Sequence, residues 1–416
     1  MRRIMAAIEQ RPSSGPPGRW LSIVGIGEDG PDGLSPRARR LVEAAELVFG
    51  GRRHLDLAGD LVKGEANAWP SPFSVEPVLA ARGRPTCVLA SGDPFLHGVG
   101  ATLARHVPPS EMEVVPAASA FSLAASRLGW PLHEVVTLSL HGRPLELVGP
   151  HLHPRTRLLV LTSDSAGPRA LAGLLVEAGF RSARLIVLEA LGGVRERIRE
   201  RAADAFDVAD VDPLNLVAIE TGEAAAARIL SFAPGLDDAL FEHDGQLTRR
   251  EVRALTLSAL APRRGEMLWD IGAGAGSVAI EWMLADASLR AVAVEARAER
   301  AGRIVRNARR LGVPGLRVVT GEAPAAMSGL PPPDAIFIGG GGSDPGVIEA
   351  ALAALPSAGR LVANAVTLET EAVLLARHAA LGGSLLRVAL SRAAPLAGMT
   401  GWRPAMPITQ WAWTKP

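Results

Sequence analysis

The sequence predicts an α/β protein made of two successive domains. Three observations lead to this prediction. Short apolar runs alternate with helix-like stretches along both halves of the chain, a pattern typical of largely parallel sheets whose strands are joined by helices. A glycine-rich loop follows a strand in each half, within Leu89–Gly100 and within Leu268–Trp282. A turn-rich stretch, "APGLDDALFEHDG", separates the halves.

The first half is expected to begin after a flexible leader over residues 1–19, which is rich in Pro, Gly and Ser. A strand is predicted over 21–27 and then a helix, capped by Ser35, with Pro36 at its first position and Gly50 just past its end. A later helix is expected to start at Asp164 or Ser165 and to end at Gly179. Further strands are predicted at "TCVLA", "MEVVP", "RLLVLT", "RLIVLEA" and "NLVAIE".

The second half is predicted to span residues 237–416, after a domain over 20–224 and a linker over 225–236. Thr248 and Glu251 have the spacing of a capping box ahead of a helix. Another helix is expected to begin near Ser277. Strands are predicted at "EMLWDIG", "RAVAVEA", "LRVVTG", "DAIFIGG" and "RLVANAV".

Composition narrows the classes of function. With 44 basic and 43 acidic side chains the net charge is +1, which favours neither a nucleic-acid partner nor a membrane surface. Apolar runs break before the ~20 residues of a membrane span. The lone Cys87 cannot form an internal disulfide, so we expect a buried core residue and a reducing, cytoplasmic location.

The loop of the second half indicates the kind of cofactor. Its glycines, Gly272, Gly274 and Gly276, are spaced G-x-G-x-G, whereas dinucleotide sites usually show G-x-G-x-x-G. Asp270 ends the preceding strand, where a carboxylate would repel a pyrophosphate and attract a cation. S-adenosylmethionine (SAM) carries an ammonium and a sulfonium and no phosphate. We therefore predict a SAM site; a plain glycine turn whose acids cap helices is the alternative.

Acidic residues at later strand ends extend this site. Glu295 ends the second strand of the domain, where an acid commonly accepts the ribose hydroxyls. Glu322, between Gly321 and Ala323, follows the third strand and is expected near the adenine. After the fourth strand, Gly340 and Gly341 are expected to let the backbone approach substrate, although a loose turn would look the same.

These motifs carry a resemblance to a known family. The runs "LTRREVRA", "LWDIGAGAGSVAIEW", "VVTGEAPAA", "DAIFIGGGG" and "RLVANAV" resemble the decarboxylating, Rossmann-like class I SAM methyltransferases of corrin biosynthesis, from about Asp237 onward. That family usually shows Thr-Lys where this chain has Thr248-Arg249, and both keep the positive charge. Arg249 is a candidate to contact substrate; a solvated helix face is the alternative for it and for the neighbouring Arg250 and Arg253.

The loop "ASGDPFLHG" of the first half would by itself indicate only a rigid Asp-Pro turn. Together with "VGIGEDGPDGLSPRARRLVEAAELVFGGRRHL", "VPAASAFSLAASRLGWP", "LSLHGRP" and "VLEALGGVRERI", it resembles the tetrapyrrole methylases, whose two α/β lobes form a cleft for SAM. The resemblance implies the following cofactor residues: Gly25, Gly27, Gly92, Asp93, Ala118, Ser119 and Ala120. His141 and Arg143 are candidates for substrate carboxylates, as are Arg52 and Arg53. A packing histidine is the alternative for His141, and a solvated helix face is the alternative for Arg52 and Arg53.

The two families, fused in this order, resemble the bifunctional methyltransferases of cobalamin biosynthesis, which methylate carbons 5 and 15 of a tetrapyrrole and decarboxylate its ring-C acetate. The resemblance implies two SAM sites, a tetrapyrrole substrate, no metal and a homo-oligomer. Two alternatives stay open. The second domain distantly resembles methyltransferases of transfer-RNA adenine, which would need a basic tract, and a non-catalytic SAM sensor would bind SAM without transferring methyl groups.

Overall fold

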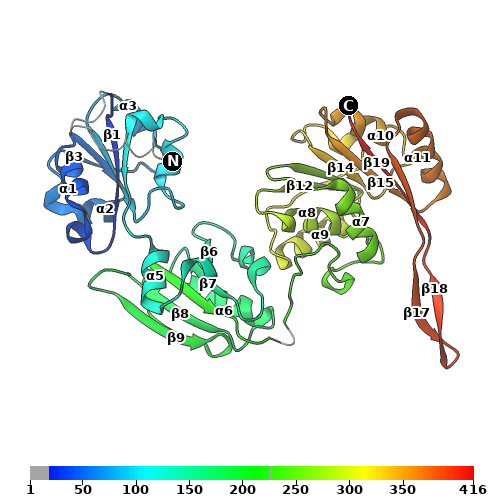
Figure 1. The fold of residues 1–416 in the computed structure, drawn as a ribbon, viewed down its shortest axis with the longest axis horizontal. Coiled ribbons are helices and arrows are strands. Elements are labelled where there is room, and N and C mark those ends of the chain that lie inside the picture. The colour runs from blue at the N-terminus through cyan, green and yellow to red at the C-terminus, as the bar shows by residue number, and fades with distance from the viewer. Residues whose placement is uncertain (1–17, 225–226) are drawn as a thin grey trace, which may run out of the picture. The chain divides into compact units, whose positions relative to one another are not determined.

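The computed structural model describes residues 18–224 and 227–416 (Figure 1). It divides into two compact units, one of residues 18–143 and 154–224 and the other of residues 144–153 and 227–416. The predicted leader, residues 1–19, lies almost entirely outside the described residues. Part of the predicted linker is built into the second unit, because Leu230 and Leu236 belong to its core.

The first unit begins with a five-stranded sheet in the order β3-β2-β4-β1-β5, with every pair parallel. The side chains of β1 alternate between two cores, with Leu21 and Ile23 on one face and Val24 and Ile26 on the other. Because all five strands are parallel, their carboxyl ends lie at one edge of the sheet. The elements are β1 (Leu21–Ile26), α1 (Pro36–Glu43), β2 (Leu47–Gly50), α2 (Arg52–Ala58), β3 (Glu65–Ala68), α3 (Glu76–Ala80), β4 (Thr86–Ser91), α4 (Val99–Leu103) and β5 (Met112–Val115).

The predicted helix, which starts at Pro36 and ends just before Gly50, is wrong in its second half. Ser35 caps it as expected, accepting a hydrogen bond from the Ala38 N–H at 3.2 Å, but the helix ends at Glu43. Leu47–Gly50 instead forms β2, and all four of its residues are buried. An uninterrupted apolar run fits a strand that is covered on both faces.

A second five-stranded sheet completes the first unit, in the order β6-β7-β10-β8-β9. Only β6 and β7 are parallel, so the expectation of largely parallel pairing is right for the first sheet and wrong here. The turn between β8 and β9 is too short for a parallel crossover. The elements are α5 (Ala120–Leu128), β6 (Val136–Ser139), β7 (Arg157–Leu161), α6 (Gly167–Glu177), β8 (Arg184–Glu189), β9 (Arg197–Ala202) and β10 (Asn215–Glu220).

The second unit is built on a seven-stranded sheet in the order β13-β12-β11-β14-β15-β19-β16, with β19 antiparallel to both neighbours. Leu268 faces one core, and Trp269 and Ile271 face the other, so both faces are covered. The elements are α7 (Arg250–Leu260), β11 (Met267–Ile271), α8 (Ser277–Ala285), β12 (Arg290–Glu295), α9 (Ala298–Arg310), β13 (Arg317–Thr320), β14 (Ala335–Ile338), α10 (Val347–Ala354), β15 (Arg360–Ala365), α11 (Leu368–Leu381), β16 (Ser384–Val388), β17 (Ser391–Leu396), β18 (Met399–Pro404) and β19 (Ile408–Thr414).

The start of α7 differs from the prediction. Arg249 is its N-cap and no side chain of the predicted Thr248–Glu251 capping box closes the helix. The carboxylate of Asp238 takes that role from a distance in sequence, because its Oδ1 accepts a hydrogen bond from the Arg250 N–H at 3.0 Å.

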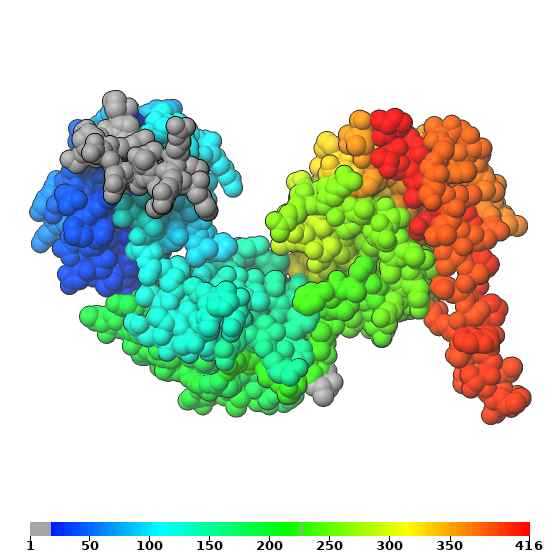
Figure 2. Space-filling model, in the orientation of Figure 1, coloured from blue at the N-terminus to red at the C-terminus, as the bar shows by residue number. Residues whose placement is uncertain are grey.

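Strands β17 and β18 form a hairpin that pairs only with itself. Figure 2 shows it in orange-red, standing away from the rest of the second unit. Its side chains Leu396, Met399 and Trp402 are 62%, 73% and 76% exposed. No helix among the described residues is both long and apolar enough to cross a bilayer.

Candidate donor-binding sites

In the first unit the predicted cofactor residues converge where β1, β4 and β5 end. A Cβ atom on Gly25 would overlap the carbonyl oxygen of Gly92, so no larger residue fits there. Gly92 has a φ of +52°, and its carbonyl accepts a hydrogen bond from the Ala117 N–H at 3.0 Å. A Cβ on Gly92 would lie 2.8 Å from the carbonyl oxygen of Ala118. The structure thus brings together segments that are distant in sequence.

Other predicted residues of this loop shape its backbone. Asp93 Oδ1 accepts a hydrogen bond from the Phe95 N–H at 2.9 Å, which holds the turn. Ser119 is the N-cap of α5, accepting from the Ser122 N–H at 3.1 Å, and Ala120 opens that helix. Gly27 lies against the Asp29 side chain within its own loop. Contacts of these residues with a cofactor stay predictions.

His141 and Arg143 follow β6 and are exposed. Arg143 donates a hydrogen bond to the Ser139 carbonyl at 3.4 Å, which keeps it near the end of its own strand. Their predicted contact with substrate carboxylates stays a prediction.

In the second unit the glycine-rich loop that follows β11 contacts the run of glycines that follows β14. The strand order reverses on either side of β11, and ligands of open α/β sheets bind at such a switch point. Gly272 has a φ of +66°, and a Cβ on it would lie 2.7 Å from the carbonyl oxygen of Gly340. Gly339 donates its N–H to the Ile271 carbonyl at 2.9 Å. Gly340 and the neighbouring Gly341 are exposed.

Asp270 lies at the centre of this edge with a side chain that is only 1% exposed. Its Oδ2 accepts a hydrogen bond from the Ala279 N–H of α8 at 3.1 Å, whereas Oδ1 is buried with no partner. Burial raises the pKa of Asp270 to about 7, the Ala279 N–H opposes that rise, and the charge of Glu295 adds to it. A buried oxygen without a partner fits a cationic hydrogen-bond donor such as the SAM ammonium group.

Glu295 lies beside this loop and is buried. Its Oε2 accepts a hydrogen bond from the Gly274 N–H at 2.8 Å and its Oε1 accepts from the Arg297 N–H at 3.0 Å. Each carboxylate oxygen keeps one further lone-pair position, which leaves Glu295 able to accept two hydroxyls; its predicted contact with the ribose stays a prediction. Gly321 donates its N–H to the Glu295 carbonyl at 3.0 Å, which places Glu322 and Ala323 next in the chain.

Gly276 is explained by packing. It is the N-cap of α8 with a φ of +75°, and a Cβ on it would lie 2.6 Å from the Ile304 side chain of α9. Its predicted cofactor contact stays a prediction, but close helix packing alone requires a glycine here.

The arginines of α7 separate into two kinds. Arg249 is half exposed and lies 3.4 Å from Asp238, so it can still meet a substrate. Arg253 is fully buried, where it donates to Glu281, Asp238 and the carbonyls of Thr248 and Leu236. Because its donors are taken up inside the unit, Arg253 is structural.

Sequence reasoning named Arg53 as a candidate but missed the polar cluster that it forms with His54 and Ser91, beside the glycine-rich loop that follows β4. Ser91, the last residue of β4, has its Oγ 2.8 Å from His54 Nε2 and 3.0 Å from Arg53 NH2. Arg53 NH2 also lies 3.0 Å from the same imidazole nitrogen, which must accept because a guanidinium can only donate. Burial lowers the pKa of His54 to about 4, with the Arg53 charge adding to it. In the sequence, the run "GGRRHL", which contains Arg53 and His54, was the signal that could have indicated this cluster.

A hollow of about 610 Å³ lies elsewhere in the first unit, and none of the predicted site residues lines it. It is found at the start of β7 and β8, where Arg157 and Arg184 pair with Glu220. Internal pairing satisfies this charge, so we place the site at the glycine-rich loops.

Two family models match the chain. Residues 21–206 match the tetrapyrrole (corrin/porphyrin) methylases and residues 239–415 match a precorrin methyltransferase domain. The chain is also 62% identical to precorrin-6Y C(5,15)-methyltransferase [decarboxylating] from Sinorhizobium sp, over 95% of this chain and 96% of that protein. The chain belongs to the precorrin-6Y C(5,15)-methyltransferase family. The predicted fold, a tetrapyrrole methylase domain followed by a Rossmann-like methyltransferase domain, is confirmed.

Shorter proteins resemble parts of this precorrin-6Y methyltransferase family member. A cobalt-precorrin-7 C(5)-methyltransferase from Salmonella typhimurium is 28% identical over 43% of this chain and 88% of its own. A probable cobalt-precorrin-6B C(15)-methyltransferase (decarboxylating) from Pyrobaculum calidifontis is 41% identical over 33% of this chain and 72% of its own. The names of the shorter proteins thus give the C(5) and C(15) methylations separately, whereas the names of the longer family members combine them.

Proposed function

We propose that this chain methylates precorrin-6Y, also called precorrin-6B, at carbons 5 and 15 and decarboxylates its ring-C acetate, giving precorrin-8 in cobalamin biosynthesis. The identity of 62% along nearly the whole length of a decarboxylating C(5,15)-methyltransferase carries this proposal. Two glycine-rich loops, each at the carboxyl ends of parallel strands, support it.

We assign C5 methylation to the first unit and C15 methylation with decarboxylation to the second. The family models support this division, because the tetrapyrrole methylase match ends at residue 206 and the precorrin methyltransferase match begins at residue 239. Each unit would bind its own SAM, at the Gly25–Gly92–Ala118 contact in one and at Asp270 and Glu295 in the other.

The chemistry asks mainly for positioning. In methyl transfer the bond from sulfur to methyl breaks as the bond from carbon to methyl forms, so the protein must hold the carbon in line at roughly 3 to 3.5 Å. In decarboxylation the bond to the carboxylate breaks, CO₂ leaves, and the electron pair enters the conjugated ring, which takes up a proton. The ring itself is the electron sink, so a dry setting for the acetate is the main requirement.

The test uses the full chain, SAM and precorrin-6B, with product masses as the readout. Gly92→Ala should abolish only the first unit's methylation, because its Cβ would lie 2.8 Å from the Ala118 carbonyl oxygen. Gly129→Ala is the matched control, since that glycine has a similar φ of +67° and nothing within 4 Å. Asp270→Asn should abolish the other methylation together with CO₂ release. Loss of CO₂ release in Gly92→Ala alone would contradict the division of labour.

Three further expectations belong to this proposal. We expect the chain to self-associate, and the exposed apolar side chains of the β17–β18 hairpin offer a surface for this contact. Sedimentation over a range of protein concentrations tests the expectation. A net charge of +1 supports the absence of a nucleic-acid partner. Cys87 is buried, which raises the pKa of its thiol to about 12 and fits an inert core residue in a reducing cytoplasm.

A further inference from the structure

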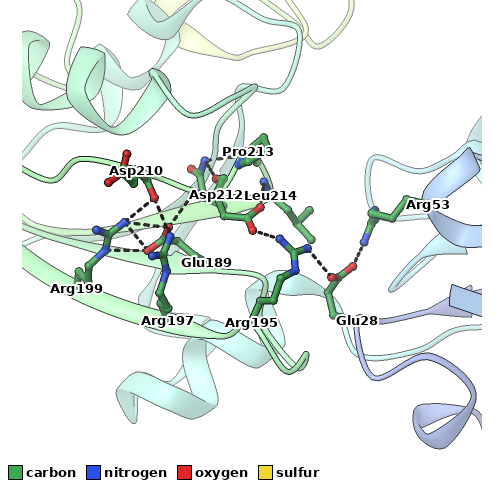
Figure 3. Close-up of polar contacts among 11 residues, drawn as sticks. Glu28, Arg53, Glu189, Arg195, Arg197, Arg199, Asp210, Asp212, Pro213 and Leu214 are labelled. Carbon is green, nitrogen blue, oxygen red and sulfur yellow. Dashed lines mark hydrogen bonds and ion pairs between the residues drawn. The ribbon is translucent and has the colours of Figure 1, made fainter. Parts of the chain in front are cut away.

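A line of ion pairs joins the end of β1 to the turn between β8 and β9 (Figure 3). Glu28 follows β1, and each oxygen of its carboxylate meets a different arginine: Oε1 accepts from Arg53 and Oε2 accepts from Arg195 NH2 at 3.4 Å. The backbones are close as well, because a Cβ on Gly193 would lie 2.7 Å from the Glu28 Cβ. The turn is therefore seated against the loop that follows β1.

The line continues into the second sheet of the unit. Arg195 NH1 donates to Asp212, whose backbone N–H donates to Glu189 Oε1 at 2.8 Å. Arg197 donates to the same Glu189 oxygen, also at 2.8 Å. Figure 3 shows these side chains in one row from Arg53 to Arg199.

The acids of this row are inside and the arginines are outside. The side chains of Glu28, Glu189 and Asp212 are 9%, 0% and 11% exposed. Those of Arg53, Arg195 and Arg197 are 37%, 59% and 49% exposed. Buried carboxylates of this kind fix the direction of the guanidinium groups and leave positive charge facing solvent.

The arginines differ in how many donors remain. Arg199 is structural, because its Nε, NH1 and NH2 all donate, to Glu189 and to the carbonyls of Ala209 and Asp210. Arg195 keeps its Nε without an acceptor among the described residues, and its contact with Glu28 is long. Arg195 can therefore take a further anion without losing its fixed position.

Arg53 connects this row to the loop at Gly92 that is predicted to bind SAM. Its NH2 donates to Ser91 Oγ at 3.0 Å, and Ser91 directly precedes Gly92. The imidazole of His54, whose pKa is lowered to about 4, is neutral near pH 7 and adds no second charge beside it. The positive charge of Arg53 is thus held one residue from the loop expected to bind SAM.

We propose that Arg53 and Arg195 bind carboxylate groups of the tetrapyrrole at the methylation site of the first unit. This inference rests on the proposed function, which supplies a substrate with several carboxylates. A guanidinium matches a carboxylate with two parallel hydrogen bonds, and such charged pairs are the stronger class. Glu28 between the two arginines repels a carboxylate that is bound out of register, so the row selects the spacing of two substrate side chains.

The experiment measures the KM of the full chain for the tetrapyrrole in C5 methylation, at saturating SAM. Arg195→Gln should raise this KM by about ten- to a hundredfold, the loss expected for charged hydrogen bonds, with kcat close to that of the unmodified protein. Arg53→Gln should raise it in the same way. CO₂ release by the second unit of the same molecules should not change, and calorimetry should show unchanged affinity for SAM.

Arg201→Gln is the matched control. Arg201 lies on β9, the strand that follows the turn of Arg195, and it pairs with the exposed Asp207, so its loss should leave the KM as it was. If melting curves show that Arg195→Gln does not fold, Arg195→Lys keeps the positive charge beside Asp212 and removes the planar fork. The same rise in KM is then required of it.

An unchanged KM in the folded Arg195 variant, or an equal rise in Arg201→Gln, would overturn this inference. Failure of the unmodified chain to methylate any tetrapyrrole is a different result, because it would overturn the proposed function itself.

Discussion

The two carboxylate oxygens of Asp270 lie in different surroundings. Oδ2 accepts the Ala279 N–H near the start of α8, which is a structural role, and Oδ1 has no partner although it is buried. The sequence presented these roles as competing interpretations. The structure allows both, because one oxygen supports the helix and the other is buried and has no hydrogen-bond partner.

The pH dependence of this group can be predicted. With a pKa raised from 3.8 to about 7, the neutral carboxyl favours the folded state, so its contribution is full below about pH 4 and is lost as the pH rises through 7. Asp270→Asn cannot titrate. In the absence of SAM, its melting temperature should therefore fall less between pH 4 and 8 than that of the unmodified protein.

SAM binding should depend on pH in the opposite direction. The ammonium group requires ionised Asp270, so affinity at the second unit should rise by up to about tenfold per pH unit between pH 5 and 7 and level off above that. Asp270→Asn should abolish SAM binding at the second unit, so calorimetry on this variant should show only the first unit's site, with no such slope. A pH-independent affinity in the unmodified protein would show that Asp270 does not meet the ammonium group.

Gly25 gives a second prediction at this scale. A side chain there would overlap the Gly92 carbonyl, which is backbone and cannot turn aside, so Gly25→Ala should destabilise the first unit by at least about 1–3 kcal/mol. Gly173→Ala lies within α6 with nothing within 4 Å and should be neutral or stabilising by up to about 1 kcal/mol. Equal melting temperatures of the two variants would contradict the close approach.

Single residues were predictable where a motif surrounds them. Gly92, Asp270 and Glu295 each end or follow an apolar strand, and that pattern is local. Glu28 and Arg195 are 167 positions apart and look like ordinary surface charges in the sequence. Only the folded chain brings them together.

At the scale of elements, the predicted strands were those with a continuous apolar core. Several missed strands are polar or lie at sheet edges, such as β3 with "EANA" and β9 with "RIRERA", whereas the missed strands β2 and β19 lie inside their sheets. The side chains of the polar strands carry no clear alternation, and hydrogen bonds to a neighbour define them. The wrong end of α1 has a similar cause, because burial between β3 and β4 decides that Leu47–Gly50 is a strand.

The attachment of α7 to α8 supplies a prediction for elements. Arg253 and Glu281 form a buried ion pair, and Glu281 also accepts the N–H groups of Gly235 and Leu236. Arg253→Met should cost about 3–5 kcal/mol of unfolding free energy, because Glu281 would stay buried without its cation. Arg264→Met removes an exposed pair with Asp286 and should cost less than about 1 kcal/mol. Denaturant unfolding of both variants makes the comparison.

At the scale of the whole molecule, each unit has its own sheets, cores and glycine-rich loop. If each loop binds its own SAM, calorimetry should find two SAM molecules per unmodified chain. The Gly92→Ala variant and the Asp270→Asn variant should each bind one. The double variant should bind none. A single SAM bound by the unmodified chain would contradict the two-site proposal.

The chain contains no tyrosine, and of its eight tryptophans only Trp402 is exposed, on the hairpin of β17 and β18. The tryptophan emission that acrylamide can quench therefore reports on the hairpin, without any added label. Acrylamide quenches an exposed indole and spares a covered one, so dilution of the protein reveals directly whether another copy shields this hairpin.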